Sequence, residues 1–147
     1  MERYKPRDFG FARVALAIPK TRVADCDFNA DQIIDLIQNE NINAVTIVTF
    51  TKGAVRGNHY HKETFQWNYL ISGKIKLLSQ ISDKDVVETI MKKGDLVVTG
   101  PDERHALVGL EESELLVLTK GPRGAKEYER DTFRLEIPLV IQKQSQV

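Results

Sequence analysis

The sequence predicts an all-β protein, either a sandwich or a barrel of short strands. Short apolar and β-branched segments recur from Ile42 onward, and the clearest of them alternates polar and apolar side chains. Turn residues separate these segments, at Ser72-Gly73-Lys74, Ser82 to Asp85 and Lys93-Gly94-Asp95. Many short strands at regular spacing with turns between them are typical of sandwiches and barrels.

Two segments precede the regular strands. Residues 11–18 are apolar, lie between a glycine and a proline, and predict a first strand or arm. Residues 29–38 are ambiguous between helix and strand, because Asn29 could cap a helix that places three isoleucines on one face.

The central segments give the clearest strand signals. Residues 42–50 are apolar on both faces, which predicts a strand covered on both sides. Residues 65–72 alternate strictly. One face of this strand carries Phe65, Trp67, Tyr69 and Ile71, and the other carries Gln66, Asn68, Leu70 and Ser72.

The remaining strands follow at similar spacing until a break at Gly121. We expect them at residues 74–80, 86–91, 96–99, 105–110 and 114–119. The charged run 121–136 predicts a solvated loop followed by an edge strand at 132–137. The alternative is a flap over the mouth of the barrel, in which Arg123, Lys126 or Tyr128 contacts a ligand.

Length and composition restrict the class of protein. The 147 residues fit one domain, and 41% hydrophobic residues are enough for a core. Net charge is zero with interspersed signs, so neither a nucleic acid nor a membrane is an expected partner. The single cysteine, Cys26, cannot form an internal disulfide, and no apolar run is long enough to span a bilayer. The N-terminus is too charged for a signal peptide, so we expect a cytoplasmic protein.

The three histidines are concentrated in two segments. His59 and His61 are separated by one residue, and alternate residues of a strand share a face. His105 lies in a second segment punctuated by Gly94 and Pro101. Imidazole is a general ligand for zinc, iron, nickel, copper and manganese. The histidines therefore predict either a metal site or a metal-free polar pocket.

The first segment resembles the first motif of the cupin superfamily. That motif is a glycine, five residues, His-x-His, three or four residues, a glutamate, six residues and a glycine. Gly53, His59, His61, Gln66 and Gly73 fall on these positions, with glutamine in place of glutamate.

The second segment resembles the second cupin motif, a glycine, five residues, Pro-x-Gly, two residues and a histidine. Gly94 opens it and His105 closes it, while Pro101 falls one residue late and Glu103 replaces the inner glycine. The resemblance implies a double-stranded β-helix, the cupin jelly roll, over residues 31–138. Residues 1–30 would then be an N-terminal arm, residues 139–147 a tail, and residues 29–38 would include a short strand.

The resemblance also implies a four-ligand pocket of His59, His61, Gln66 and His105. A divalent transition metal (Zn, Ni, Fe or Mn) is the expected cofactor. Because Gln66 stands where a carboxylate is usual, the site carries less negative charge and should hold a cation less tightly.

The string Arg56-Gly57-Asn58-His59-Tyr60-His61-Lys62 points to sugar-modifying cupins. It resembles the metal-free 3,4-ketoisomerases of dTDP-linked keto sugars, whose histidines shuttle protons. It also resembles the zinc-binding cupin half of capsular-polysaccharide reductases. His105 favours a metal, whereas Gln66 weakens that expectation.

This resemblance implies an isomerase or epimerase that acts on a nucleotide-linked or keto sugar in polysaccharide biosynthesis. Removal of an α-proton needs a base, and among the side chains only histidine has an unperturbed pKa near neutral, so His59 and His61 are the catalytic candidates. Arg56 could bind a phosphate or carboxylate, or form a surface ion pair. Asn68 shares the face of Gln66 and is a second substrate-binding candidate.

Two other functions and an oligomeric state remain open. The pocket could bind a small acid or sugar without catalysis, as a sensor, or could serve a metal-dependent dioxygenase, which the missing carboxylate disfavours. The aromatic face of residues 65–71 lies opposite Gln66 and needs cover. Either the N-terminal strand or a second subunit could cover it, and we expect a homodimer with this face buried.

Overall fold

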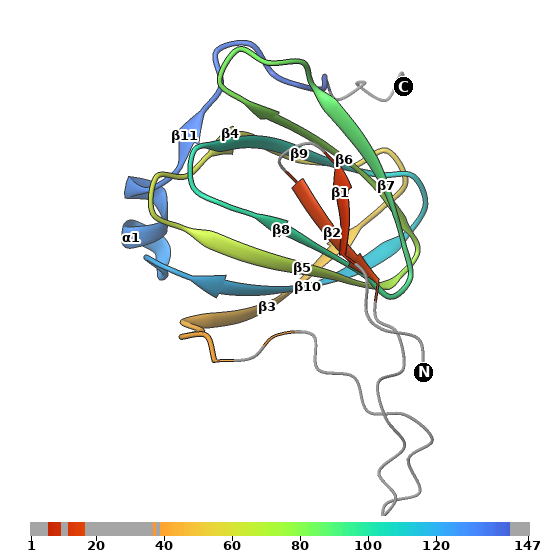
Figure 1. The fold of residues 1–147 in the computed structure, drawn as a ribbon, viewed down its shortest axis with the longest axis horizontal. Helices are drawn as coiled ribbons and strands as arrows, with labels where there is room; N and C mark the ends of the chain where they lie inside the picture. Colours follow the sequence, from red (N-terminus) through yellow and green to blue (C-terminus); the bar gives the residue numbers. More distant parts are fainter. Residues whose placement is uncertain (1–5, 10–11, 17–36, 38, 142–147) are drawn as a thin grey trace, which may run out of the picture.

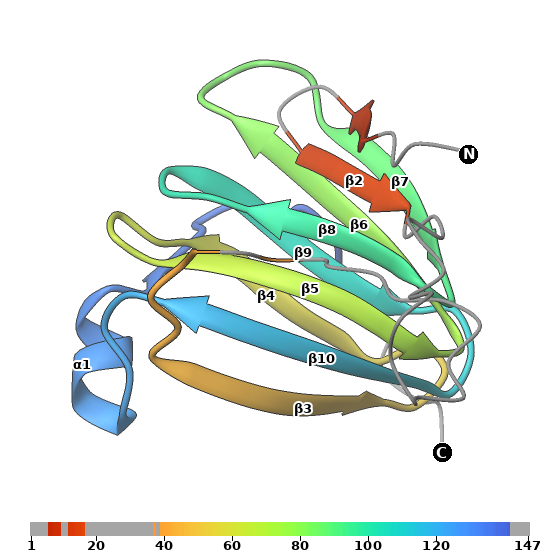
Figure 2. The same ribbon diagram turned by 60° about the horizontal axis from the view of Figure 1, so that its bottom comes forward.

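The computed structural model describes residues 6–9, 12–16, 37 and 39–141. The predicted all-β class is confirmed, because strands form two antiparallel sheets that pack face to face as a jelly roll (Figures 1 and 2). Among the described residues, no helix is both long enough and hydrophobic enough to cross a bilayer.

The first sheet has six strands. Its order is β1 (Pro6–Phe9), β2 (Ala12–Leu16), β8 (Asp95–Thr99), β5 (Phe65–Ser72), β10 (Ser113–Lys120) and β3 (Ala44–Phe50). The predicted first strand at 11–18 corresponds to β2, whereas most of the ambiguous segment 29–38 lies outside the described residues.

The second sheet has five strands and carries the histidine motifs. Its order is β11 (Phe133–Arg134), β4 (Val55–Tyr60), β9 (Glu103–Gly109), β6 (Lys74–Ile81) and β7 (Val87–Lys92). One short helix, α1 (Ala125–Arg130), lies between β10 and β11 at one end of the two sheets (Figure 1).

The core fills the space between the sheets with side chains from alternate positions of facing strands. Burying each of these large apolar side chains contributes about 1.5–3 kcal/mol. The core includes Phe50, Leu70, Ile75, Leu77, Met91, Val97 and Leu115.

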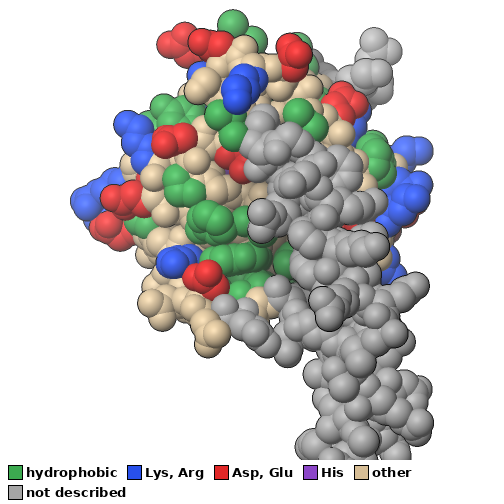
Figure 3. Space-filling model, in the orientation of Figure 1, with side chains coloured by type: hydrophobic (Ala, Val, Ile, Leu, Met, Phe, Trp, Pro, Cys, Tyr) green, Lys and Arg blue, Asp and Glu red, His purple; other side chains and the backbone are tan. Residues whose placement is uncertain are grey.

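A second apolar cluster lies on the outer face of the six-stranded sheet. The alternation predicted for β5 is confirmed: Gln66, Asn68 and Leu70 are buried on one side, while Trp67 packs with Leu96 on the other. Figure 3 shows hydrophobic side chains gathered on this face over β5 and β10. The cluster is completed by Phe65, Tyr69, Val98, Leu118, Ile42 and Ile37.

Two predictions about strands are wrong. The strand β3 is not covered on both sides, because it is the last strand of its sheet and Val45 and Ile47 are 66% and 51% exposed. The strand predicted at residues 132–137 is reduced to the two residues of β11, and the loop before it contains α1. Apolar alternation does not distinguish an edge strand from a central one, and α1 has few apolar residues to mark it.

The turn between β5 and β6 offers a test of this packing. Gly73 has φ +88°, and a methyl group there would collide with the Ser113 hydroxyl and the Glu112 carbonyl, whereas Gly94 has φ +89° and nothing within 4 Å. We expect Gly94→Ala to lower the free energy of unfolding by about 1–2 kcal/mol, the cost of left-handed backbone. Gly73→Ala should cost a further ~1–3 kcal/mol from overpacking. Urea denaturation of both variants measures the difference, and equal losses would refute the collision.

Candidate functional site

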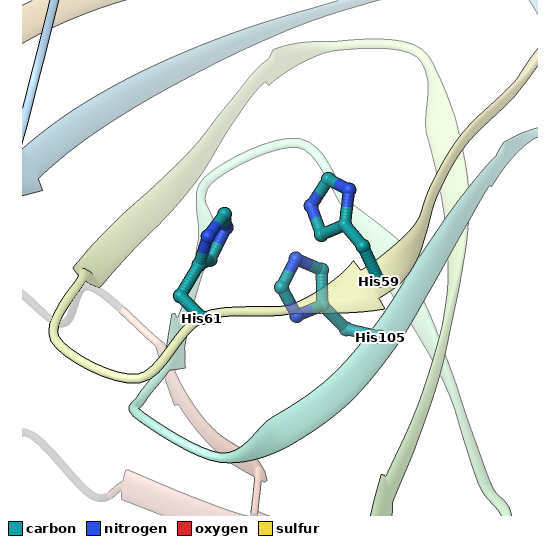
Figure 4. A group of neighbouring side chains, drawn as sticks. All are labelled: His59, His61 and His105. Atoms are coloured by element: carbon teal, nitrogen blue, oxygen red, sulfur yellow. The ribbon is translucent and has the colours of Figure 1, made fainter. Parts of the chain in front are cut away.

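The three histidine rings converge between the two sheets. His59 comes from β4, His105 from β9, and His61 from the loop that follows β4 (Figure 4). The ring centroids lie 4.7 Å apart for His59 and His61, 4.8 Å for His59 and His105, and 5.5 Å for His61 and His105. One nitrogen from each ring lies within 4.8 Å of the others.

A bulge in β4 places His59 opposite His105. Gly57 pairs with Ala106 in the antiparallel register, and a regular ladder would then pair His59 with Arg104. The register shifts between Gly57 and His59, so His59 pairs with His105 instead. A bulge inserts one extra residue and re-aims the side chains that follow it.

The bulge depends on two consecutive residues with positive φ. Gly57 has φ +91°, and a Cβ there would lie 2.8 Å from the carbonyl oxygen of His105. Asn58 has φ +57°, a conformation that asparagine tolerates better than most residues. Its amide oxygen accepts the N–H groups of Leu139 and Val140 at 2.9 and 3.2 Å, and its amide nitrogen donates to the Val140 carbonyl at 2.9 Å.

Hydrogen bonds to main-chain carbonyls fix the tautomers of two rings. Nδ1 of His61 lies 2.8 Å from the carbonyl of Asp131, and Nδ1 of His105 lies 3.0 Å from the carbonyl of Glu103. A carbonyl only accepts, so both Nδ1 atoms carry the proton and both Nε2 atoms keep their lone pairs. Nε2 of His61 and Nδ1 of His59 are buried and have no hydrogen-bond partner.

Burial keeps the three imidazoles neutral. It lowers the pKa of His59 to about 3, assisted by the repulsion that a protonated His59 would meet from protonated His105 or His61 and from nearby arginines. It lowers the pKa of His105 to about 4 and also lowers that of His61. Neutral imidazoles with free lone pairs are the form in which histidine binds metals.

The histidines adjoin a cavity of about 420 Å³, a volume typical of small-molecule sites. His59, His105 and Gln66 line it, and so do the predicted substrate-binding residues Arg56 and Asn68. His61 is buried beside the cavity and does not line it. The amide nitrogen of Asn68 already donates within the protein, at 3.2 Å to the Val97 carbonyl and 3.3 Å to Thr99.

The segment 121–134 forms one wall of this cavity, which is the flap arrangement and not the solvated loop that we favoured from the sequence. Arg123, Tyr128 and Arg134 line the cavity, whereas Lys126 is exposed and does not. The guanidinium of Arg123 lies 4.6 Å over the Tyr128 ring, and that ring lies 5.4 Å from His61.

The sequence did not identify Asp131, which anchors this segment. Its carboxylate accepts hydrogen bonds from the main-chain N–H groups of residues 62–64 and from the Thr64 hydroxyl. Burial alone raises the pKa of Asp131, but these hydrogen bonds outweigh burial and lower it. An aspartate within a charged run gives no sequence signal for such a contact. Thr46, Glu129 and Thr132 also line the cavity and were not predicted.

The residues present fit a divalent metal. Three neutral imidazoles have lone pairs available, two of the ring nitrogens are buried without partners, and Gln66 lines the cavity that these histidines adjoin. Bonds of about 2.0–2.1 Å place tetrahedral donors roughly 3.4 Å apart. The ring nitrogens lie within 4.8 Å of one another, so they must move closer together around an ion.

A family model described as the cupin domain matches residues 46–119. That span runs from β3 to β10 and contains all three histidines. The chain belongs to the cupin family. A search of the curated proteins finds no match to the sequence.

Solved structures share the fold at low sequence identity. The TDP-quinovose 3,4-ketoisomerase WlaRB from Campylobacter jejuni is 17% identical with a TM-score of 0.65, over 85% of this chain and 93% of that one. The sugar 3,4-ketoisomerase QdtA from Thermoanaerobacterium thermosaccharolyticum, in complex with TDP, is 22% identical with a TM-score of 0.60, over 84% and 88%. The dTDP-4-dehydrorhamnose 3,5-epimerase from Sulfolobus tokodaii is 14% identical with a TM-score of 0.63, over 83% and 77%.

Variants of Asn58 separate the two contributions that hold the bulge. Asn58→Gly keeps positive φ accessible but removes the hydrogen bonds to residues 139 and 140, and should cost about 1–3 kcal/mol. Asn58→Ala should cost roughly 1 kcal/mol more, because alanine disfavours positive φ. Urea denaturation measures both values. A smaller loss for alanine than for glycine would contradict this account of the bulge.

Proposed function

We propose that this cupin is an isomerase or epimerase that acts on a nucleotide-linked or keto sugar in polysaccharide biosynthesis. The observation that carries the proposal is the convergence of His59, His61 and His105 beside a cavity whose wall includes three arginines. The solved structures with this fold include several that are described as nucleotide-sugar ketoisomerases and epimerases, which supports the same substrate class.

The charge of the cavity wall favours an anionic ligand. Arg56, Arg123 and Arg134 line the cavity, and the acidic residue that lines it, Glu129, lies 3.9 Å from Arg134. Guanidinium groups bind phosphates and carboxylates through paired hydrogen bonds. We propose that Arg56 and Arg123 hold the phosphates of a nucleotide sugar, and that Asn68 contacts the sugar.

We propose that His59, His61 and His105, with Gln66, hold a divalent transition metal (Zn, Ni, Fe or Mn). Such an ion would supply Lewis acidity toward the keto oxygen of a sugar. The depressed pKa values of His59 and His105 support this role, because a base with a pKa of about 3 or 4 takes up protons poorly near pH 7.

The metal-free isomerase is the second candidate, in which His59 and His61 move the α-proton. One observation favours it: Nδ1 of His59 is buried and unpartnered, so in the tautomer protonated at Nε2 its lone pair is available to a proton as well as to an ion. The fixed tautomer of His61 leaves Nε2 as its only base. The two candidates exclude each other for any one ring nitrogen, because a nitrogen that binds a metal cannot also take up a proton.

We also propose a cytoplasmic homodimer. The support is the apolar outer face of the six-stranded sheet, which continues onto the exposed side chains of Val45 and Ile47 on β3.

Metal binding distinguishes the two candidates. We expect protein purified without chelators to carry a divalent metal. The metal-depleted protein should bind Co²⁺ and show the absorption spectrum of Co²⁺ coordinated by nitrogen atoms. His105→Ala should weaken Co²⁺ binding by more than about 100-fold, since even loss of an outer partner costs 10–100-fold. Gln66→Glu should strengthen it by adding negative charge. A protein with no metal and no Co²⁺ affinity would favour the metal-free candidate.

Proton transfer tests the reaction itself. We expect the protein to exchange deuterium from heavy water into the carbon beside the keto group of TDP-4-keto-6-deoxyglucose, as measured by mass spectrometry. Arg56→Met should raise KM by about 10–100-fold, the equivalent of one charge-assisted hydrogen bond. Arg104→Met is the matched control, because Arg104 pairs with Gln80 and Ser82 away from the cavity. No exchange despite tight sugar binding would indicate a sensor.

A further inference from the structure

The loop from Gly121 to Asp131 begins and ends against the same buried residue, Thr64. At its start, a Cβ on Gly121 would lie 3.0 Å from the Thr64 Cα atom. At its end, the Asp131 carboxylate accepts the Thr64 N–H at 2.9 Å and also the Thr64 hydroxyl. Thr64 is fully buried, so water does not compete for these contacts. The two ends of the loop are therefore held together beside Thr64.

Asp131 is also joined to the three residues before Thr64. Its carboxylate accepts the N–H groups of Lys62 at 3.0 Å and Glu63 at 3.2 Å. Its main-chain carbonyl accepts the Nδ1 proton of His61 at 2.8 Å. One residue therefore fixes both the turn after His61 and the tautomer of the His61 ring.

The same loop carries three residues of the cavity wall, Arg123, Tyr128 and Glu129. Arg123 donates to the Thr46 hydroxyl at 3.1 Å, and its guanidinium lies over the ring of Tyr128. Tyr128 in turn contacts the His61 ring. The position of this wall and the orientation of His61 thus depend on the same anchor.

We propose that Asp131 is a positioning residue that couples the ligand-binding wall 121–131 to the histidine site. Its carboxylate holds the loop against the turn 62–64, and its carbonyl holds His61 with Nε2 free toward the other two rings. The expected effect of Asp131 on metal binding rests on the proposed function, whereas its expected effect on the tautomer of His61 does not.

The test compares Asp131→Asn with Asp83→Asn, which makes the same charge change in an exposed turn. Asp131→Asn should weaken Co²⁺ binding by about 10–100-fold, the range for partners that orient a metal-binding histidine. Long-range proton–nitrogen NMR of the metal-free protein should show one His61 tautomer in the parent and in Asp83→Asn, and a mixture in Asp131→Asn.

A second variant covers a failure of Asp131→Asn to fold. Thr64→Val removes one hydrogen bond to the carboxylate and should shift both measurements in the same direction by less. Unchanged Co²⁺ affinity and an unchanged His61 tautomer in the folded variants would overturn the proposal, even if the melting temperature falls. If the parent binds no Co²⁺, the metal part of the proposed function fails, and the tautomer comparison alone decides the role of Asp131.

Discussion

The close approach of β4 and β9 is the constraint on which the site depends. Gly57 lies so near the His105 carbonyl that any side chain would separate the two strands, and the bulge at Asn58 then turns His59 toward His105. Two histidines that are 46 residues apart in the chain become direct neighbours across one ladder. The third histidine, His61, lies outside the strands, and the turn after β4 and the carbonyl of Asp131 hold its ring.

Electrostatics explain why this arrangement suits a ligand that brings negative charge. Burial favours the neutral form of the imidazoles, so the histidine cluster itself is uncharged near neutral pH. The surrounding arginines remain charged, and in a partly enclosed cavity their field is screened less than at an open surface. A cation among the histidines would add to that positive field. The charge of a phosphate or carboxylate would offset both.

The sequence predicted the back of the cavity, which strands form, better than its front, which the segment 121–134 forms. Alternation in β5 placed Gln66 and Asn68 on one face, because alternate residues of a strand share a face. The resemblance to the cupin motifs implied that His59 and His105 join Gln66 in one pocket, and all four residues line the cavity. The bulge at Asn58 depends on a local backbone conformation that the Gly57-Asn58 pair permits but does not require. The contacts of Asp131 join residues 67 or more positions apart, and no local pattern encodes such a distance.

This division between back and front bears on specificity. The back wall consists of strand residues whose direction the jelly roll determines, and the fold is shared with solved structures at 14–22% identity. The front wall is a loop with one short helix, so its side chains are free to differ without disturbing the sheets. Because Arg123 and Tyr128 reach the cavity from this loop, the proposed function places selectivity among anionic sugars there. The proposed chemistry, in contrast, would reside in His59 on β4, His61 just after β4 and His105 on β9.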